Sequence, residues 1–299
     1  MKSIVVTFLL VLPCLIFGQN LQQEWLKYIG QSKPGLTPIK FASDLVSLNN
    51  QYEFGSVFSS NGEEFYYAAD MAGKAEIRYM KLNKGQWTKP VVLLSDKVFS
   101  YNDPMLSPDE SKLFFISDRP LGKSGEKKDY DIWYIEKKGS GWSDPVNAGP
   151  VINSDKNEYY ISFSNKGTMY FSSNRKGKDE RADNYNIYAA KVKGREFTQP
   201  ASPGDSINTQ HYEADVFVAS DESYLIFSAS RPDGYGAGDL YISFKKADGT
   251  WTKAKNMGDT INTPGHELCP FVSKDGKYFF YTSCQDIYWV DARILDKLR

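Results

Sequence analysis

Short apolar runs alternate with polar turns along this chain, and the same pattern returns about every 50 residues. A first run ends in a polar turn, as Ser56–Ser59 does before Asn61-Gly62, and such turns between apolar runs are hairpin signals. A more apolar second run follows, such as Phe65-Tyr66-Tyr67, and then a third run. The third runs begin 55, 55, 53 and 47 residues apart, at Glu76, Asp131, Asn186, Asp239 and Asp286. A period of this length predicts stacked or radial copies of one supersecondary unit.

A fourth strand is announced in four of the repeats by an aromatic residue, in three of them followed by proline. The segments are Trp87-Thr88-Lys89-Pro90, Trp142-Ser143-Asp144-Pro145, Phe197-Thr198-Gln199-Pro200 and Trp251-Thr252-Lys253-Ala254. Proline removes a backbone donor, which only an outermost strand tolerates. Four antiparallel strands with a proline-marked edge describe one blade of a β-propeller.

The two ends of the chain complete each other. The last repeat runs out near Asp291 after its third strand, and the missing strand appears at the front, where Leu36-Thr37-Pro38-Ile39 leads into Ser43–Ser47. An N-terminal strand that completes the C-terminal blade removes exposed sheet edges. The sequence therefore predicts an all-β fold, a closed five-bladed propeller of four-stranded antiparallel blades over residues 36–291. Residues 19–35 form an N-terminal extension and residues 292–299 a C-terminal tail.

The motifs inside the repeats resemble those of a known family. They are the Ser-Pro-Asp turn, Phe-Ile-Ser-Asp-Arg at 115–119, Phe-Ser-Ser-Asn-Arg at 171–175 and the Asp-Ile-Tyr strands. This combination resembles the TolB-type repeat, a WD40-like propeller family, and the ending Asp-Ile-Tyr-Trp-Val-Asp-Ala at 286–292 looks like that of exported Bacteroidota propellers. The resemblance implies periplasmic or surface binding and assembly, while some relatives are enzymes that act on polysaccharides. Fold alone does not decide between these.

The N-terminus and the net charge indicate where the protein is located and which partners it is expected to have. Residues 1–18 combine Lys2 with an apolar run from Ile4 to Phe17, which reads as a secretory signal peptide too short for a transmembrane span. A lipoprotein signal at Cys14 is the alternative, disfavoured by Pro13. The chain is therefore expected to be exported, periplasmic or secreted, without stable membrane insertion and monomeric. A net charge of −1 gives no basic surplus, so nucleic acid is not expected as a partner.

The cysteines of the mature chain leave two alternatives open. Cys269 and Cys284 lie on adjacent predicted strands of the last repeat. An oxidising compartment permits a disulfide, although the register sets them about two residues out of opposition. Two free thiols are the other reading.

Acidic residues recur where the inner strands begin, which places them around one mouth of the channel. Nine residues before each hairpin turn stand Glu53, Tyr101, Glu158, Glu213 and Glu267, and Asp103 and Asp215 follow two positions after the second and fourth of these. Three readings compete: glutamates that accept backbone N–H bonds, a cation or basic-ligand site, and a carboxylate pair that cleaves a glycosidic bond. No cofactor is expected, with Ca²⁺ or another divalent cation as the alternative.

Two histidines and three arginines complete the candidates. His211 and His266 precede Glu213 and Glu267 in consecutive repeats, where they are candidates for a general base, a metal ligand or plain loop residues. Arg119, Arg175 and Arg231 end second strands. Each is expected to pair with the acid that opens its own third strand, or else to bind an acidic ligand.

The sequence thus predicts a binding module for a peptide, protein or glycan at the channel mouth. The alternative is a glycoside hydrolase or polysaccharide lyase that uses Glu213, Glu267, His211 and His266 at the same mouth. An envelope assembly factor that docks through a propeller face is the third reading.

Overall fold

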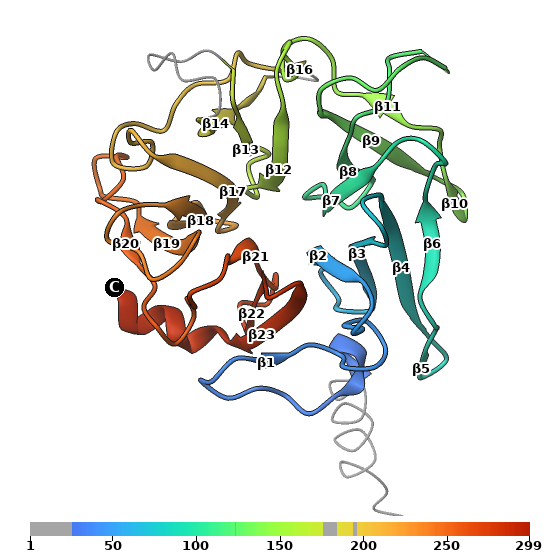
Figure 1. Cartoon of the computed structure of the whole chain (residues 1–299), viewed down its shortest axis with the longest axis horizontal. Helices are drawn as coiled ribbons and strands as arrows, with labels where there is room; N and C mark the ends of the chain where they lie inside the picture. The colour runs from blue at the N-terminus through green and yellow to red at the C-terminus, as the bar shows by residue number, and fades with distance from the viewer. Residues whose placement is uncertain (1–25, 123, 176–183, 194–195) are drawn as a thin grey trace, which may run out of the picture.

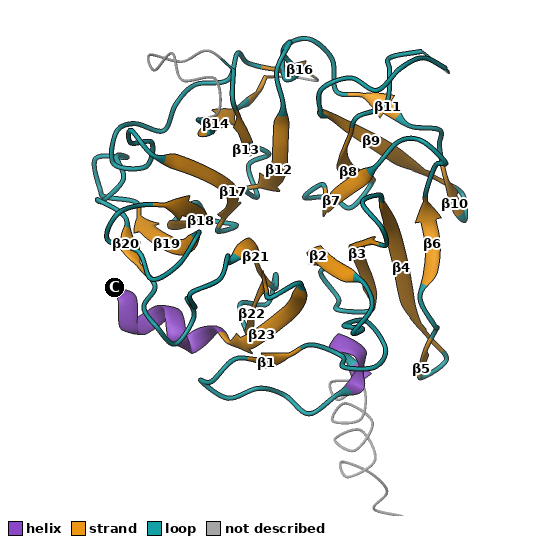
Figure 2. Ribbon diagram, viewed as in Figure 1, coloured by secondary structure: helices purple, strands orange, loops and turns teal. Residues whose placement is uncertain are grey.

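Five antiparallel sheets surround a central axis in the computed structural model, which describes residues 26–122, 124–175, 184–193 and 196–299 (Figure 1). The predicted signal peptide lies outside these residues. The inner strands are β2 (Tyr52–Phe58), β7 (Tyr101–Leu106), β12 (Glu158–Phe163), β17 (Tyr212–Val218) and β21 (Leu268–Val272). The second strands are β3 (Glu64–Asp70), β8 (Lys112–Ser117), β13 (Met169–Ser173), β18 (Tyr224–Ser230) and β22 (Tyr278–Ser283). This arrangement confirms the five-bladed propeller (Figure 2).

Third strands and short outer strands finish the blades. The third strands are β4 (Ala75–Asn83), β9 (Asp131–Lys138), β14 (Asn186–Ala190), β19 (Asp239–Phe244) and β23 (Asp286–Asp291). The outer strands are β6 (Val91–Leu94), β11 (Val146–Asn147) and β20 (Lys255–Asn256), and in the third blade an isolated bridge joins Ala189 to Ala201.

The aromatic residues that announced the fourth strands belong to small hairpin tips instead. β5 (Gln86–Trp87) pairs with the end of β4, β10 (Gly141–Trp142) with the end of β9, and β16 (Glu196–Phe197) with β15 (Val192–Lys193). In the first two blades, the outer strand begins just after the proline, since proline itself has no N–H to donate to a ladder.

The N-terminal strand closes the ring as predicted. β1 (Ile39–Lys40) pairs antiparallel with β23, with Ile39 opposite Trp289 and Lys40 opposite Tyr288. An aromatic cluster packs the seam between the last and first blades: the rings of Phe41 and Trp289 are 5.3 Å apart and those of Phe58 and Phe280 are 5.5 Å apart. The seam is thus held by buried aromatic area as well as by backbone hydrogen bonds.

The terminal segments pack on the outside of the ring. In the N-terminal extension the 3-10 turn η1 (Tyr28–Gly30) buries Tyr28 against Phe58 and Tyr278, and the Trp87 indole donates to the Leu26 carbonyl at 2.6 Å. The tail is the 3-10 helix η2 (Ala292–Leu298). In the described part of the chain, no helix is long and apolar enough to cross a membrane.

Both cysteines are free thiols. Cys269 is buried near the axis and Cys284 is exposed in the turn between β22 and β23. Of the two readings left open by the sequence, the structure has the unbridged one.

Candidate functional site

The glutamates that begin the inner strands hold the linkers between blades. Glu158 accepts hydrogen bonds from the Ser154 amide at 3.0 Å and hydroxyl at 2.6 Å, four residues upstream. Glu213 does the same with Thr209 at 3.0 and 2.5 Å, and Glu267 with Thr263 at 2.9 and 2.7 Å. All three side chains are fully buried. They lie inside the blades and not in the open mouth.

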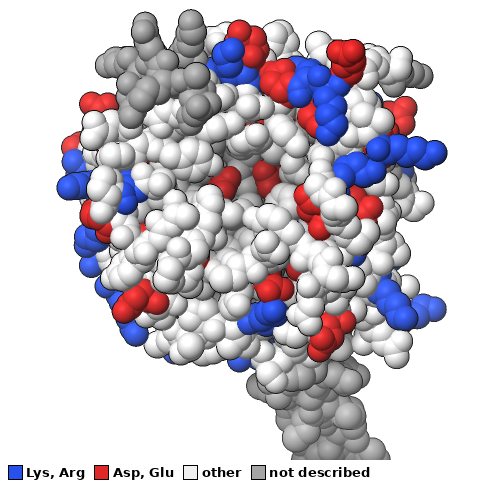
Figure 3. Space-filling model, in the orientation of Figure 1, with Lys and Arg blue, Asp and Glu red and all other residues white. Residues whose placement is uncertain are grey.

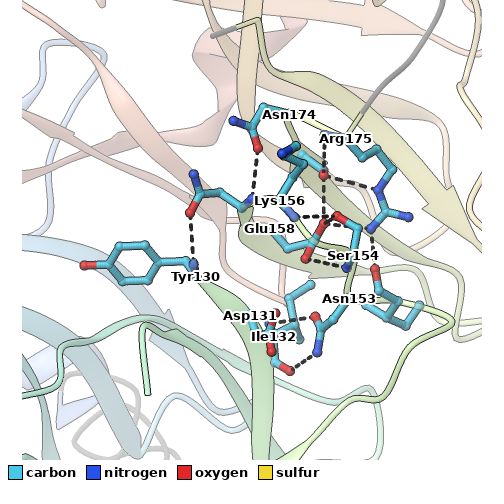
Figure 4. A network of polar contacts seen from close by, with 12 residues as sticks. Tyr130, Asp131, Ile132, Asn153, Ser154, Lys156, Glu158, Asn174 and Arg175 are labelled. Atoms are coloured by element: carbon cyan, nitrogen blue, oxygen red, sulfur yellow. Dashed lines mark hydrogen bonds and ion pairs between the residues drawn. The ribbon is translucent and has the colours of Figure 1, made fainter. Parts of the chain in front are cut away.

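Partners on the second strand use the remaining oxygen lone pairs. Arg175 contacts Glu158 at 2.9 Å, and Arg231 contacts Glu213 at 3.0 Å. Figure 4 shows Arg175, Ser154 and Glu158 converging in one network. The Ser283 hydroxyl donates to Glu267 at 2.7 Å. A carboxylate so fully hydrogen-bonded is a structural joint, which matches the first of the three sequence readings.

The third-strand aspartates have other partners than the arginines expected. Asp131 contacts Lys128 at 2.7 Å and Asn147 at 2.8 Å, while Asp239 accepts from the Gly236 amide at 3.0 Å and from Asn256 at 2.6 Å. The expected pairings of Arg119 with Asp131 and of Arg231 with Asp239 are therefore absent from the described residues, because each aspartate is bound by groups of its own loop and outer strand instead.

The first blade departs from this joint. Glu53 is fully buried and accepts from the Leu48 amide at 3.2 Å, but Met71 stands where three other blades have arginine. The Oε2 atom of Glu53 has no hydrogen-bond partner. Burial, only partly offset by hydrogen bonds from Leu48 and Gln51, raises the pKa of Glu53 to about 7.

In the second blade another side chain takes the place of the linker-binding glutamate. Tyr101 lies opposite Ser117, the same register in which Glu158 lies opposite Ser173. Asp118 takes over the glutamate's task and accepts from the Ser100 amide at 2.8 Å. Arg119 is left without a glutamate and lies over the Trp133 ring, 4.8 Å from its centroid.

A β-bulge follows at the same point in every inner strand and turns one residue towards the axis. The strand register shifts after Phe54, Asn102, Tyr159, Ala214 and Leu268. The bulge residues all have φ between 45° and 58°, and they are Gly55, Asp103, Tyr160, Asp215 and Cys269. A bulge re-aims a side chain and often occurs beside a functional site. These five residues form what we call the bulge ring.

The bulge ring is cross-linked by hydrogen bonds and closed at its centre. Asp103 accepts from the Tyr160 amide, and Asp215 accepts from the Cys269 amide. The Tyr160 hydroxyl donates to the Pro270 carbonyl at 2.8 Å, and Tyr160 is fully buried at the axis. At Gly55 a Cβ atom would come within 2.9 Å of the Asp103 backbone, so only glycine fits there. The channel is therefore a closed cup and not an open pore.

The cup opens towards the face where the inner strands begin. The hollow has a volume of about 210 Å³. Its lining comprises Tyr52, Phe54, Asn102, Asp103, Ile116, Tyr130, Tyr159, Asp215, Leu268 and Cys269. Figure 3 shows acidic atoms at the bottom of the central hollow, and the acidic residues of the lining are Asp103 and Asp215.

The two aspartates are poorly compensated. Asp103 is only 6% exposed, and neither aspartate forms a salt bridge within the described ranges. Burial, reinforced by the charge of Asp215, raises the pKa of Asp103 well above its usual range. Burial raises the pKa of Asp215 to about 6, and His266 opposes this shift. The Asp103 carboxylate also lies 3.8 Å from the Cys269 thiol.

Half-buried aromatic residues form the rim of the cup. Tyr159 stacks on Tyr185 at 5.0 Å, and the row continues to Tyr130 at 5.4 Å on one side and to Tyr212 at 5.5 Å on the other. The amide of Glu158 bonds to the Tyr130 carbonyl, so the inter-blade backbone bond sets this row. Tyr52 and Phe54, 4.9 Å apart, line the first-blade side.

The histidines do not join the cup lining. His211 is half-buried and its amide donates to the Thr209 hydroxyl, while the His266 ring is 3.3 Å from the Ser228 hydroxyl. No group of three His, Cys, Asp or Glu side chains suited to a metal ion occurs among the residues that the structure describes.

Of the sequence candidates, the structure therefore brings together Asp103 and Asp215 and leaves the glutamates and arginines in the blades. The residues that the sequence reasoning missed are Cys269, Tyr160 and the aromatic rim. Cys269 and Tyr160 stand two positions after a glutamate, as Asp215 does, and that spacing is the signal that would have found them.

Comparison with known proteins finds solved structures that align with this chain. No protein-family model and no curated protein matches the chain. A solved protein of unknown function from Dyadobacter fermentans aligns with a TM-score of 0.52 and 13% identity, over 88% of this chain and 84% of its own. TolB from Acinetobacter baumannii aligns with a TM-score of 0.49 and 14% identity, over 80% of this chain and 54% of its own. A putative TolB from Agrobacterium tumefaciens gives 0.47 and 13%, over 77% and 69%.

This chain spans about half the length of the Acinetobacter protein. At such identities the likeness concerns the fold alone. With its antiparallel sheets arranged around one axis, the chain has the fold of a five-bladed β-propeller, and its repeat motifs resemble those of the TolB type.

Proposed function

We propose that this protein is an exported interaction module that binds a segment of a partner polypeptide in the cup. The observation that carries the proposal is the cup itself: a cavity of about 210 Å³ on the axis, with an aromatic rim and two poorly compensated carboxylates. Concave sites that combine apolar walls with a few polar groups are typical of ligand binding. Export rests on the signal-like residues 1–18.

The hydrolase alternative receives no support from the geometry. Glu213 and Glu267 are fully buried and hydrogen-bonded on several sides, so neither faces a space in which a sugar would fit. A glycosidase needs two carboxyl groups that flank an accessible bond.

Site-specific photo-crosslinking tests the interaction. A photoreactive phenylalanine analogue placed at Phe54, on the rim, should capture a discrete partner in the native host. The matched control is the same analogue at Val146, which is 40% exposed on the outer strand β11. Equal capture from both positions, or none from Phe54, would contradict binding at the cup.

A further inference from the structure

We propose that the cup takes an organic cation at the end of a side chain of its partner, a lysine ammonium or an arginine guanidinium. The inference rests on the proposed function and names the group that the cup recognises.

The bottom of the cup carries two carboxylates that lack a cation of the protein's own. Asp103 is more than nine-tenths buried, and the described lysines and arginines form their salt bridges with other acids. The titratable groups that face the pair are Cys269, Tyr160, Tyr52, Tyr159, Tyr212 and the exposed His266. Burying carboxylates without compensation is costly, and an incoming cation would remove that cost.

The cup also holds a polar atom without a partner. Asn102 lines the cavity, and its buried side-chain oxygen Oδ1 accepts no hydrogen bond. Buried acceptors are almost always satisfied, so this oxygen is a candidate acceptor for a donor that enters the cup. An ammonium supplies three N–H donors and a guanidinium five, enough for Asp103, Asp215 and Asn102 together.

The walls suit a cation as well as the bottom does. Tyr52, Phe54, Tyr130 and Tyr159 line the cavity with ring surfaces. The face of an aromatic ring attracts a cation, and more strongly where water is excluded. The same rings pack against the methylene stem of lysine or arginine.

The depth of the carboxylates favours a side chain over an amino sugar. Asp103 is only 6% exposed and lies on the bulge ring with Tyr160, which closes the axis. A cation must therefore reach inwards on a narrow flexible stem, as in lysine and arginine. An amino sugar carries its nitrogen directly on a broad ring, and glucosamine is therefore the probe that tests this distinction.

Methyl NMR on the full mature chain tests the inference with defined small probes. Ile116 and Leu268 line the cup and serve as reporters, while Ile187, buried in the third blade and outside the lining, serves as reference. The probes are the N-acetyl methylamides of lysine and arginine, their neutral counterparts norleucine and citrulline, and glucosamine. We expect saturable shifts at Ile116 and Leu268 with lysine or arginine, and at least tenfold weaker binding of both neutral probes.

The double variant Asp103→Asn with Asp215→Asn should bind the cationic probes at least tenfold more weakly than the wild type. Its binding of the neutral probes should be unchanged. Asp155→Asn removes the same charge from a side chain that is 91% exposed, so it should bind as the wild type does. Should the double variant fail to fold, Asp215→Asn alone should still weaken cation binding at least threefold.

Equal binding of lysine and norleucine, preference for glucosamine, or full affinity in the aspartate variants would overturn the inference. Crosslinks from Phe54 would then still support the proposed function. Cation binding without such crosslinks would instead leave the inference standing and remove the proposed function.

Discussion

The Tyr160 hydroxyl donates a hydrogen bond to the Pro270 carbonyl at 2.8 Å, from the third blade to the fifth. These blades are not neighbours in the ring, so the bond crosses the axis and ties together strands that share no sheet. Tyr160 therefore both closes the channel and cross-links two blades that are not neighbours.

Replacing Tyr160 with phenylalanine should cost about 1–3 kcal/mol in the free energy of unfolding, because the buried Pro270 carbonyl loses its donor. Urea denaturation measures the change. Tyr188→Phe is the matched control, since Tyr188 is half-buried and its hydroxyl makes no hydrogen bond described for this chain; it should change stability by less than about 0.5 kcal/mol. A Tyr160→Phe protein as stable as wild type would show that this cross-link contributes nothing.

The free energy of unfolding of the wild type should fall as the pH rises, and the Glu53→Gln variant should lack the part of this fall that Glu53 causes. Burial raises the folded-state pKa of Glu53 to about 7 from 4.5, so the folded protein holds a proton that the unfolded chain has released. The contribution of Glu53 to stability is therefore full below pH 4.5, falls as the pH rises towards 7 and stays low above it. Denaturation curves at pH 5 and pH 8 measure this difference, which should be smaller in the variant.

Glu213→Gln is the contrasting case and should destabilise the protein at pH 8 by about 3 kcal/mol. It leaves the Arg231 side chain, which is only 7% exposed, without its counter-charge. If Glu53→Gln and Glu213→Gln behaved alike, the arginine would not be what distinguishes these two blades.

Tyr28→Ala should destabilise the protein by about 3–5 kcal/mol, the range for removing a buried aromatic ring. Tyr28 is 4% exposed and packs against Phe58 of the first blade and Tyr278 of the last, so it clamps the seam where the ring closes. Chemical denaturation measures the loss, and Tyr28→Phe, which keeps the ring, should recover most of it. A small effect of the alanine variant would show that the N-terminal extension contributes little to the stability of the propeller.

Binding of the lysine probe should strengthen as the pH rises through about 6, since Asp215 must ionise to pair with a cation and burial raises its pKa to about 6. Titrations at pH 5 and pH 7 check this. Asp215→Asn should flatten the change, whereas His266→Gln should leave most of it, which separates the carboxylate from the nearby imidazole. Affinity that falls over this interval would contradict the role of Asp215.

The architecture followed from the sequence because each repeat carries its own turn and strand signals. The spacing from Glu76 to Asp286 set the number of blades, and the unfinished last repeat pointed to Ile39 as the closing strand. These signals are local, so they survive without knowledge of tertiary contacts.

The candidate site followed less well, because the bulge breaks the alternation on which strand reasoning depends. Strict alternation places Glu213 and Asp215 on one face of β17, but the positive φ of Asp215 separates them, with Glu213 inside the blade and Asp215 in the cup. A positive φ is uncommon at residues other than glycine, and residue type alone does not reveal where it occurs. The predicted pairing of Arg231 with Asp239 was also wrong. The long Arg231 side chain reaches across to Glu213 on the neighbouring strand, and the strand pattern alone does not show that contact.

The pairing of β1 with β23 also sets the order in which the protein can be completed during synthesis. Ile39 and Lys40 leave the ribosome among the first residues of the propeller, yet their partners Trp289 and Tyr288 are among the last. Until those residues emerge, the first strand has no sheet to join, and every nascent chain carries an unpaired edge. An edge of that kind invites pairing with other chains. For this protein, the risk of aggregation is therefore concentrated before translation ends.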